Sequence, residues 1–265
     1  MKVRILFAAI LSVITISNVF GQARPAGEIA GVATGSMWSE AGTVSPLEKN
    51  NVIFETGAQQ KVDVFDFRLF SLTPYVAGGA TFDTKGYDWN NQFVGSVGVQ
   101  LNAVLPHGMV SVGTAYGYED RFKTHLTAGA PEYFVQDWFG WQLPAGEKRY
   151  PGSTWATYGA TAPIEGNNRV LYGFVQQGVV AGHFFGHADF PVVLFGEMTF
   201  ARDTKRFDWN NFIRPGAGLK IVMPRGLEVG ASFIHEERDI SNTQANGVTL
   251  FLKVDTDWFL LGTRR

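Results

Sequence analysis

A long internal repeat is the feature of this sequence that most limits its fold. The block Asp88-Trp89-Asn90-Asn91 returns 120 positions later as Asp208-Trp209-Asn210-Asn211. Three further markers return in the same order at an offset of 117: Gly35-Ser36-Met37-Trp38 as Gly152-Ser153-Thr154-Trp155, Pro46-Leu47-Glu48 as Pro163-Ile164-Glu165, and Glu119-Asp120-Arg121 as Glu236-Glu237-Arg238. Such a period is longer than those of the common solenoid and propeller repeats. The sequence therefore predicts two tandem copies, residues 35–142 and 152–259, each forming half of one closed or two-lobed body.

The first residues have the layout of a secretory signal peptide. Lys2 and Arg4 precede an apolar run over 5–14, and small residues near Gly21 and Ala23 offer a cleavage site. The alternative, a retained transmembrane helix, is disfavoured because the run is shorter than the ~20 residues that span a bilayer. We therefore expect a signal peptide over 1–23 and an exported domain over 24–265. The absence of cysteine excludes disulfides, a lipoprotein anchor and Cys-containing metal sites.

The composition narrows the class of exported protein. The chain has 31 Gly and 22 Phe but only 17% charged residues, where a soluble domain has about 25%. Its net charge of −2 gives no indication of nucleic-acid binding. An exported chain rich in glycine and aromatic residues, without a second long apolar run, fits a β-barrel in the outer membrane of a Gram-negative bacterium.

Within each copy, apolar and polar residues alternate with the period of a β-strand. Phe93, Val97 and Leu101 share one predicted face, and Ser96 and Gln100 share the other. Alternation over about ten residues is long for a soluble strand and suits a tilted membrane strand. Pro-x-Gly turns over 105–108 and 223–226 join two strand pairs and are expected on the periplasmic side. The predicted strands are 35–45, 51–64, 67–82, 89–104, 108–121, 132–142, 153–162, 168–181, 188–202, 209–222, 226–238 and 246–259.

The strand count and the class of sheet each leave an alternative open. Twelve strands form an all-β, antiparallel transmembrane barrel with six strands per copy; without the short, polar openings of the two copies, 36–45 and 153–162, ten remain. A periplasmic β-sandwich would show similar alternation. Aromatic residues near the strand ends favour the barrel, because they suggest the interfacial girdles of membrane proteins. These residues are Trp38, Tyr87, Trp89, Trp138, Trp141, Trp155, Trp209 and Trp258.

The order of motifs also resembles a known group of barrels. A small-residue-plus-Trp opening, Leu72-Thr73-Pro74-Tyr75, an Asp-Thr-Lys loop and Gly98-Val99-Gln100-Leu101 follow one another. This order is similar to the C-terminal barrels of bacterial exopolysaccharide-export and phage-adsorption outer-membrane proteins. The resemblance implies an outer-membrane barrel that takes part in glycan export or serves as a receptor. Phe259, slightly inset from the end, is the candidate signal for the barrel-assembly machinery; the alternative is that a dedicated partner recognises this ending.

Charged residues on the predicted inner face form the first candidate site. Glu119 and Arg121, like Glu236 and Arg238, stand two apart on one strand and point the same way. They can form a salt-bridge network that fills a narrow barrel, because buried charges must be paired. Alternatively, they can form a charged constriction that selects solutes. The predicted lumen-lining charges are Glu55, Lys61, Glu119, Arg121, Glu197, Arg214, Lys220, Glu236 and Arg238.

The repeated Asp-Trp-Asn-Asn block forms the second candidate site. Asp and Asn cap backbone groups in turns, so the block can be a simple loop-to-strand junction. The alternative is a glycan-binding rim, in which the ring stacks on a sugar and the amides bind its hydroxyls. Its residues would be Asp88, Trp89, Asn90, Asp208, Trp209 and Asn210. The loops are modest in length, the longest candidates being 123–132 and 144–152, so we expect neither a lid nor a plug.

The sequence offers no catalytic or metal-binding constellation. His183 and His187 are four apart, but Phe184-Phe185-Gly186 between them predicts a turn rather than a metal-binding helix. His235 precedes two carboxylates, yet Tyr118 takes its place in the first copy. We therefore expect no enzyme, no cofactor and no metal.

Two functions follow from these observations. The preferred one is a porin-like small channel or conduit linked to export of exopolysaccharide or another glycan. The alternative is a non-conducting structural or receptor barrel for a phage or an envelope partner. Expected partners are outer-membrane lipid and lipopolysaccharide, the barrel-assembly machinery and, for the conduit, a glycan or periplasmic export components.

Overall fold

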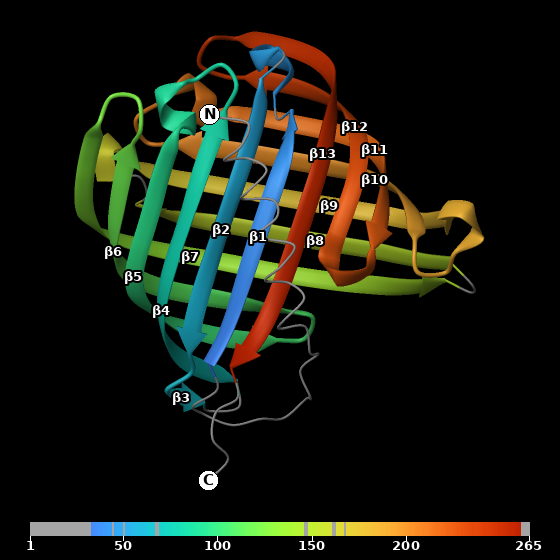
Figure 1. Ribbon diagram of the computed structural model, residues 1–265, viewed down its shortest axis with the longest axis horizontal. Helices are drawn as coiled ribbons and strands as arrows, with labels where there is room; N and C mark the ends of the chain where they lie inside the picture. Colours follow the sequence, from blue (N-terminus) through green and yellow to red (C-terminus); the bar gives the residue numbers. More distant parts are fainter. Residues whose placement is uncertain are drawn as a thin grey trace.

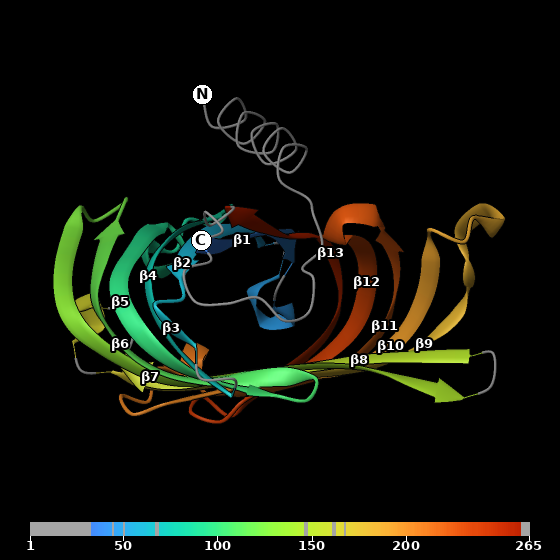
Figure 2. The ribbon, with the colours of Figure 1, turned by 90° about the horizontal axis from the view of Figure 1, so that it is seen from below.

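Twelve long antiparallel strands close into a β-barrel (Figures 1 and 2). The computed structural model describes residues 33–43, 45–49, 51–66, 69–145, 148–160, 163–166 and 168–260. The predicted signal peptide, 1–23, lies outside the described residues. Among those residues, no helix has the length and hydrophobicity that a bilayer crossing requires.

Each strand pairs with its sequence neighbour, and two pairings complete the closure. The first strand, β1 (Ala33–Thr43), pairs with the last, β13 (Thr243–Leu260), while β2 (Val52–Val62) pairs with β4 (Phe70–Asp83) past the two-residue β3 (Phe65–Asp66). The remaining strands are β5 (Gln92–Leu105), β6 (Gly108–Arg121), β7 (Leu126–Ala145), β8 (Lys148–Ala160), β9 (Arg169–His183), β10 (Pro191–Asp203), β11 (Phe212–Met223) and β12 (Leu227–Arg238). This closed barrel confirms the predicted fold class and excludes the sandwich.

The strand count of twelve is confirmed, since both doubtful opening strands are present as β1 and β8. Several predicted strand boundaries were wrong by three residues or more, among them the starts of β5, β7, β8 (148 rather than 153) and β11 (212 rather than 209). Strand β7 begins at Leu126 rather than at 132, because a tight turn closed by the hydrogen bond from His125 N to Arg121 O (2.9 Å) lets pairing with β6 resume at once. Strand β5 begins at Gln92 rather than at 89, because Asp88–Asn90 forms the 3₁₀ turn η2.

The two faces of the sheet have opposite polarity. On β5 the side chain of Val97 is 61% exposed on the outside, whereas that of Gln100 is 1% exposed on the inside. Val76, Val112, Leu194, Phe233 and Val248 continue the exposed apolar exterior. Closed strands satisfy their own backbone hydrogen bonds and present an apolar face to lipid. The protein is an outer-membrane β-barrel.

Val97→Arg tests the assignment of the outer face. A cation on the lipid face should lower the free energy of unfolding in lipid vesicles by about 2–4 kcal/mol. Urea titration of protein refolded into vesicles measures this change. Val97→Leu, which keeps the site apolar, should stay within about 1 kcal/mol of wild type. Equal stability of the two variants would contradict a lipid-facing position.

The barrel has two unlike ends. The "terminal end" carries the paired first and last strand residues, Ala33 and Leu260, and the predicted tight turns at 106–107 and 224–226. The "loop end" carries four 3₁₀ turns, η1 (Pro46–Glu48), η2 (Asp88–Asn90), η3 (Pro163–Glu165) and η5 (Asp208–Asn210). Figure 2 shows η1, in blue, inside the ring of strands. Because short turns face the periplasm in such barrels, we expect the loop end to face outward.

Candidate functional site

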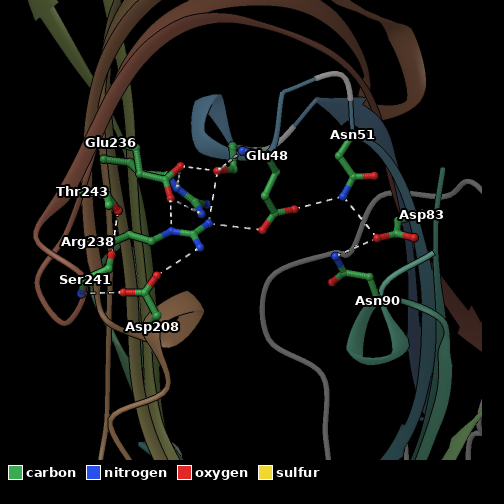
Figure 3. A network of polar contacts seen from close by, with 11 residues as sticks. Glu48, Asn51, Asp83, Asn90, Asp208, Glu236, Arg238, Ser241 and Thr243 are labelled. Atoms are coloured by element: carbon green, nitrogen blue, oxygen red, sulfur yellow. Dashed lines mark hydrogen bonds and ion pairs between the residues drawn. The ribbon is translucent and has the colours of Figure 1, made fainter. Parts of the chain in front are cut away.

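Arg238 on β12 is held by three carboxylates from three parts of the chain (Figure 3). Its Nε lies 2.8 Å from Glu236 Oε1, Nη2 lies 3.2 Å from Glu48 Oε1, and Nη1 lies 3.5 Å from Asp208 Oδ2. Glu48 belongs to η1 between β1 and β2, and Asp208 belongs to η5 between β10 and β11. One guanidinium therefore joins a wall strand to two loops.

Arg121 on β6 repeats this arrangement in the first half of the chain. Its Nε lies 2.7 Å from Glu119 Oε1, Nη2 lies 3.4 Å from Glu165 Oε1, and Nη1 lies 3.7 Å from Asp88 Oδ2. Glu165 and Asp88 belong to η3 and η2.

The glutamates at the centre of the two clusters are fully buried. Glu119 and Glu236 are both 0% exposed. The second oxygen of Glu236, Oε2, accepts a hydrogen bond from Ser45 Oγ at 2.5 Å and lies 3.0 Å from Arg214 Nε. Glu119 instead accepts the backbone N–H of Ile164 at 3.0 Å. A buried carboxylate is stable only when paired and hydrogen-bonded, so each glutamate fixes a loop against the wall.

Two aspartates at the ends of β4 and β10 order the same loops. Asp83 accepts side-chain amide hydrogens from Asn91 (2.8 Å), Asn90 (3.2 Å) and Asn51 (3.2 Å). In the second half, Asp203 accepts them from Asn211 (2.9 Å), Asn210 (3.2 Å) and Asn168 (3.1 Å).

Asn51 and Asn168 connect these aspartates to the arginine clusters. Asn51 Nδ2 also donates to Glu48 Oε2 at 3.0 Å, and Asn168 Nδ2 donates to Glu165 Oε2 at 2.9 Å. Figure 3 follows this path from Arg238 through Glu48 and Asn51 to Asp83. With η2 and η5 as the remaining links, the polar contacts form a continuous circuit around the loop end.

Four stacked aromatic rings link η2 to η5 within this circuit. Ring centroids are 4.8 Å apart between Tyr87 and Trp89, 4.7 Å between Trp89 and Trp209, and 4.8 Å between Phe207 and Trp209, with interplanar angles of 5–6°. Strands β5 and β11, which follow the two tryptophans, are separated by several strands on either side of the barrel. The stack therefore spans the mouth between the two halves.

We call the four loops at the loop end the cap, namely residues 45–49 and 51, 84–91, 163–166 and 168, and 204–211. The expectation of neither a lid nor a plug rested on the two longest candidate loops. The regions 123–132 and 144–152 lie largely in β7 and β8, while the cap consists of shorter segments that interlock. The girdle assignment was wrong for six residues. Tyr87, Trp89 and Trp209 stack in the cap, and Trp155 lines an internal cavity. Trp38 and Trp138 lie directly opposite the cavity residues Asp255 and Trp155, so they also face the interior.

The two halves of the cap carry different residue types at one left-handed backbone position. Gly86 has φ +73°, and its counterpart Arg206 adopts nearly the same conformation with φ +60°. A left-handed conformation costs a non-glycine residue roughly 1–2 kcal/mol. Arg206→Gly should therefore raise the free energy of unfolding by about 1 kcal/mol, and Gly86→Ala should lower it by a similar amount. Urea titration measures the free energy of unfolding of both variants. A lower free energy of unfolding in Arg206→Gly would contradict a strained backbone at Arg206.

Below the cap, the interior is partly filled by aromatic pairs from non-adjacent strands. Tyr75 and Phe134 meet edge to face at 6.1 Å, and Phe195 and Phe251 meet at 6.2 Å. A side chain at Gly113 or Gly230 would overlap Phe134 or Phe251, respectively, so glycine is required beneath these rings. In the first half, buried polar side chains also lie in the interior, with Asn102 bonded to Gln100, Thr73 and Ser111.

The second half retains a cavity of about 460 Å³. Its walls come from β8 to β13 together with β1 and β2. Charged and aromatic side chains dominate: Glu40, Glu55, Glu197, Glu228, Asp255, Arg214, Lys220, Lys253, Trp155, Tyr172, Phe174 and Phe251. Polar, aromatic and charged groups therefore face one internal space.

The predicted lumen-lining charges fall into three groups. Glu55, Glu197, Arg214 and Lys220 line the cavity. Glu119, Arg121, Glu236 and Arg238 form the two clusters beneath the cap. Lys61 lies near the terminal end of β2, where the ladder pairs it with Thr34 and Tyr75.

The predicted glycan rim lies in the cap, with its groups already engaged. Each face of the Trp89 ring is covered by another ring, as is each face of the Trp209 ring. Asp88 and Asp208 pair with arginines, while Asn90 and Asn210 donate to Asp83 and Asp203. A glycan role for these residues stays a prediction, and it requires the stack to separate.

The histidines do not gather in one site. His183 ends β9, and the predicted turn before His187 is present as η4 (Phe184–Gly186). His235 Nδ1 lies 2.8 Å from Asn246 Oδ1. No group of three or more His, Asp or Glu side chains suited to a metal ion occurs within the described ranges.

Comparison with known proteins gives similarity of fold only. No protein-family model and no curated protein matches the chain. Solved structures with a similar fold include the COG4313 outer membrane channel from Pseudomonas putida F1, 7% identical, with 89% of this chain and 100% of that chain covered and a TM-score of 0.42. A bacterial polysaccharide outer membrane secretin is 10% identical, with 88% and 100% covered and a TM-score of 0.35. The β domain of the Bordetella autotransporter BrkA is 13% identical, with 86% and 99% covered and a TM-score of 0.36.

The assignment of the chain as an outer-membrane barrel rests on its own closed sheet and apolar exterior.

Proposed function

We propose that the protein is a narrow outer-membrane channel for small polar solutes, and that the cap closes its outer mouth at rest. The observation that carries this proposal is the internal cavity of about 460 Å³, lined by charged groups such as Glu197 and Lys220. A barrel that served only as a scaffold would gain stability by filling this space with packed side chains. Pockets of 300–1,000 Å³ typically hold small ligands.

We further propose glycans as a solute class. Trp155 and Tyr172 stand next to each other in the cavity wall, with ring centroids 5.5 Å apart, and the carboxylate of Glu55 lines the same cavity. Aromatic faces next to hydrogen-bonding carboxylates suit the apolar faces and hydroxyls of a sugar ring. The sequence resemblance to exopolysaccharide-export barrels supports the same class.

The cap favours a second candidate function, a non-conducting structural or receptor barrel. Its two arginine clusters and its ring stack would hold the mouth closed permanently if no solute or partner opened it. In that case the four loops would act as a rigid outward surface for a phage or an envelope partner.

Uptake of sugars by proteoliposomes separates the two candidates. Vesicles containing the refolded wild-type protein should swell slowly in monosaccharide solutions and faster when the cap is weakened by Trp89→Ala. Larger oligosaccharides should be excluded in both cases. A protein that admits no sugar even with the cap weakened would rule out the channel and leave the receptor barrel.

A further inference from the structure

The lumenal cavity contains more acidic than basic groups after its internal ion pairs are matched. Lys220 Nζ pairs with Glu228 Oε2 at 3.0 Å, and Lys253 Nζ pairs with Glu40 Oε2 at 3.0 Å. Arg214 is committed to Glu236 at 3.0 Å. Among the described residues, this leaves three cavity carboxylates without a cation within 4.0 Å, namely Glu55, Glu197 and Asp255.

The two lysines show how this cavity binds an ammonium group. Lys253 Nζ sits against Glu40 and lies 5.5 Å from the ring centroid of Phe251 and 6.0 Å from that of Phe174. Lys220 Nζ is bound by Glu228 and by Gln176 Oε1 (2.7 Å), and lies 5.8 Å from the centroid of Phe195. Both amines thus use a carboxylate together with an aromatic face, a combination that favours cations.

The cavity wall contains further groups of the same two kinds. Trp155 and Tyr172, with ring centroids 5.5 Å apart, line the cavity, and the carboxylates of Glu55 and Glu197 line the same space. Gln176 Nε2 donates to Glu197 at 3.3 Å, which fixes that carboxylate facing the cavity. Bringing a cation to these groups relieves the cost of holding like charges in a confined space.

We propose that the cavity is a binding site for small organic amines, amino sugars among them, and that it prefers them to neutral sugars of the same size. The inference deepens the proposed function by naming the solute class. A cationic amine would bind the carboxylates of Glu55 and Glu197, while the ring of Trp155 covers the carbon skeleton. The volume of about 460 Å³ accommodates one such molecule.

Titration calorimetry of the full chain refolded in detergent tests the proposal with three probes. Glucosamine carries a positive amine at neutral pH, N-acetylglucosamine has that amine blocked, and glucose has none. Glucosamine should bind at least about tenfold more tightly than either neutral sugar, the factor that one charge-assisted hydrogen bond supplies. Glu197→Gln should weaken glucosamine binding by about tenfold and leave the binding of glucose unchanged.

Glu132→Gln is the matched control, because Glu132 lies on β7 and is absent from the cavity wall. It should bind glucosamine like wild type. Equal affinity for the three sugars, no measurable binding of glucosamine, or equal losses in Glu197→Gln and Glu132→Gln would each overturn the amine site. Calorimetry requires no conduction, so it tests the amine site separately from the channel. Sugar uptake without amine preference would contradict the amine site alone. Amine binding without sugar uptake would contradict the channel alone.

Discussion

Arg238→Gln is expected to destabilise the barrel by about 3–5 kcal/mol, the cost of removing one partner from a buried ion pair. The Arg238 side chain is 12% exposed and forms ion pairs with Glu236, Glu48 and Asp208. Glutamine is uncharged and shorter than arginine, so it removes these ion pairs and leaves fully buried Glu236 with Arg214 as its remaining counter-charge. Urea unfolding of vesicle-refolded protein, followed by intrinsic fluorescence, measures the loss.

Two control variants identify the source of that loss. Arg121→Gln removes the equivalent guanidinium from the first half and should cost at least as much, since Val94 takes the place of Arg214 there and offers no second cation. Arg202→Gln removes an ion pair to Asp239 whose side chains are 43% and 37% exposed, and should cost less than about 1 kcal/mol. Equal, small losses in all three variants would contradict a structural role for the clusters.

Trp89→Ala is expected to raise single-channel conductance in planar bilayers several-fold. The substitution removes both of the stacking contacts that Trp89 makes. One aromatic pair stabilises the closed cap by about 1 kcal/mol in addition to the contribution of its buried area. Loss of the Trp89–Trp209 contact should therefore multiply the fraction of molecules with an open mouth by about five.

The double variant Trp89→Ala/Trp209→Ala tests whether the two rings act as one unit. Either single substitution already removes their mutual contact. The double variant should therefore raise the conductance by a smaller factor than the product of the two single-variant factors. Trp141→Ala serves as the control, because Trp141 bonds Gln177 at 2.9 Å on β9, outside the cap, and should leave the current unchanged. Multiplicative effects, or unchanged currents in all variants, would contradict a stack that holds the mouth closed.

The sequence was sufficient to predict the barrel wall. The alternation of apolar and polar residues is a local property. Each strand therefore indicates by itself which of its faces meets lipid, as Val97 and Gln100 show on β5. The same local argument placed Glu119 with Arg121, and Glu236 with Arg238, on one side of their strands. It left open what those pairs do, because that depends on residues from other strands.

The cap could not be predicted by the same reasoning. Ser45 contacts Glu236, which is 191 positions away in the sequence. The turn η1 packs against β13 and, beyond it, against β12. The repeat did contain a signal, since Glu48 and Asn51 return as Glu165 and Asn168 in loops of the same length. A polar loop that recurs opposite recurring strand charges is a candidate for an inward-folded loop.

The aromatic rings failed as girdle markers for a related reason. Proximity to a strand end does not distinguish a ring that meets lipid from one that meets another ring across the barrel. Trp89 and Trp209 lie 120 positions apart, and only closure of the sheet brings them into contact.

Hydrogen exchange of the cap amides tests the central claim, an interlocked cap over the mouth, most directly. In segments 84–91 and 204–211, the N–H groups of Tyr87 and Phe207 bond to Asp83 and Asp203, and those of Asn90 and Asn210 bond to Tyr87 and Phe207. In wild-type protein refolded into vesicles, these segments should exchange nearly as slowly as the adjoining strand ends and far more slowly than the turn at 106–107. Arg238→Gln should speed the exchange of both segments. Exchange of the wild-type segments as fast as that turn would contradict the cap.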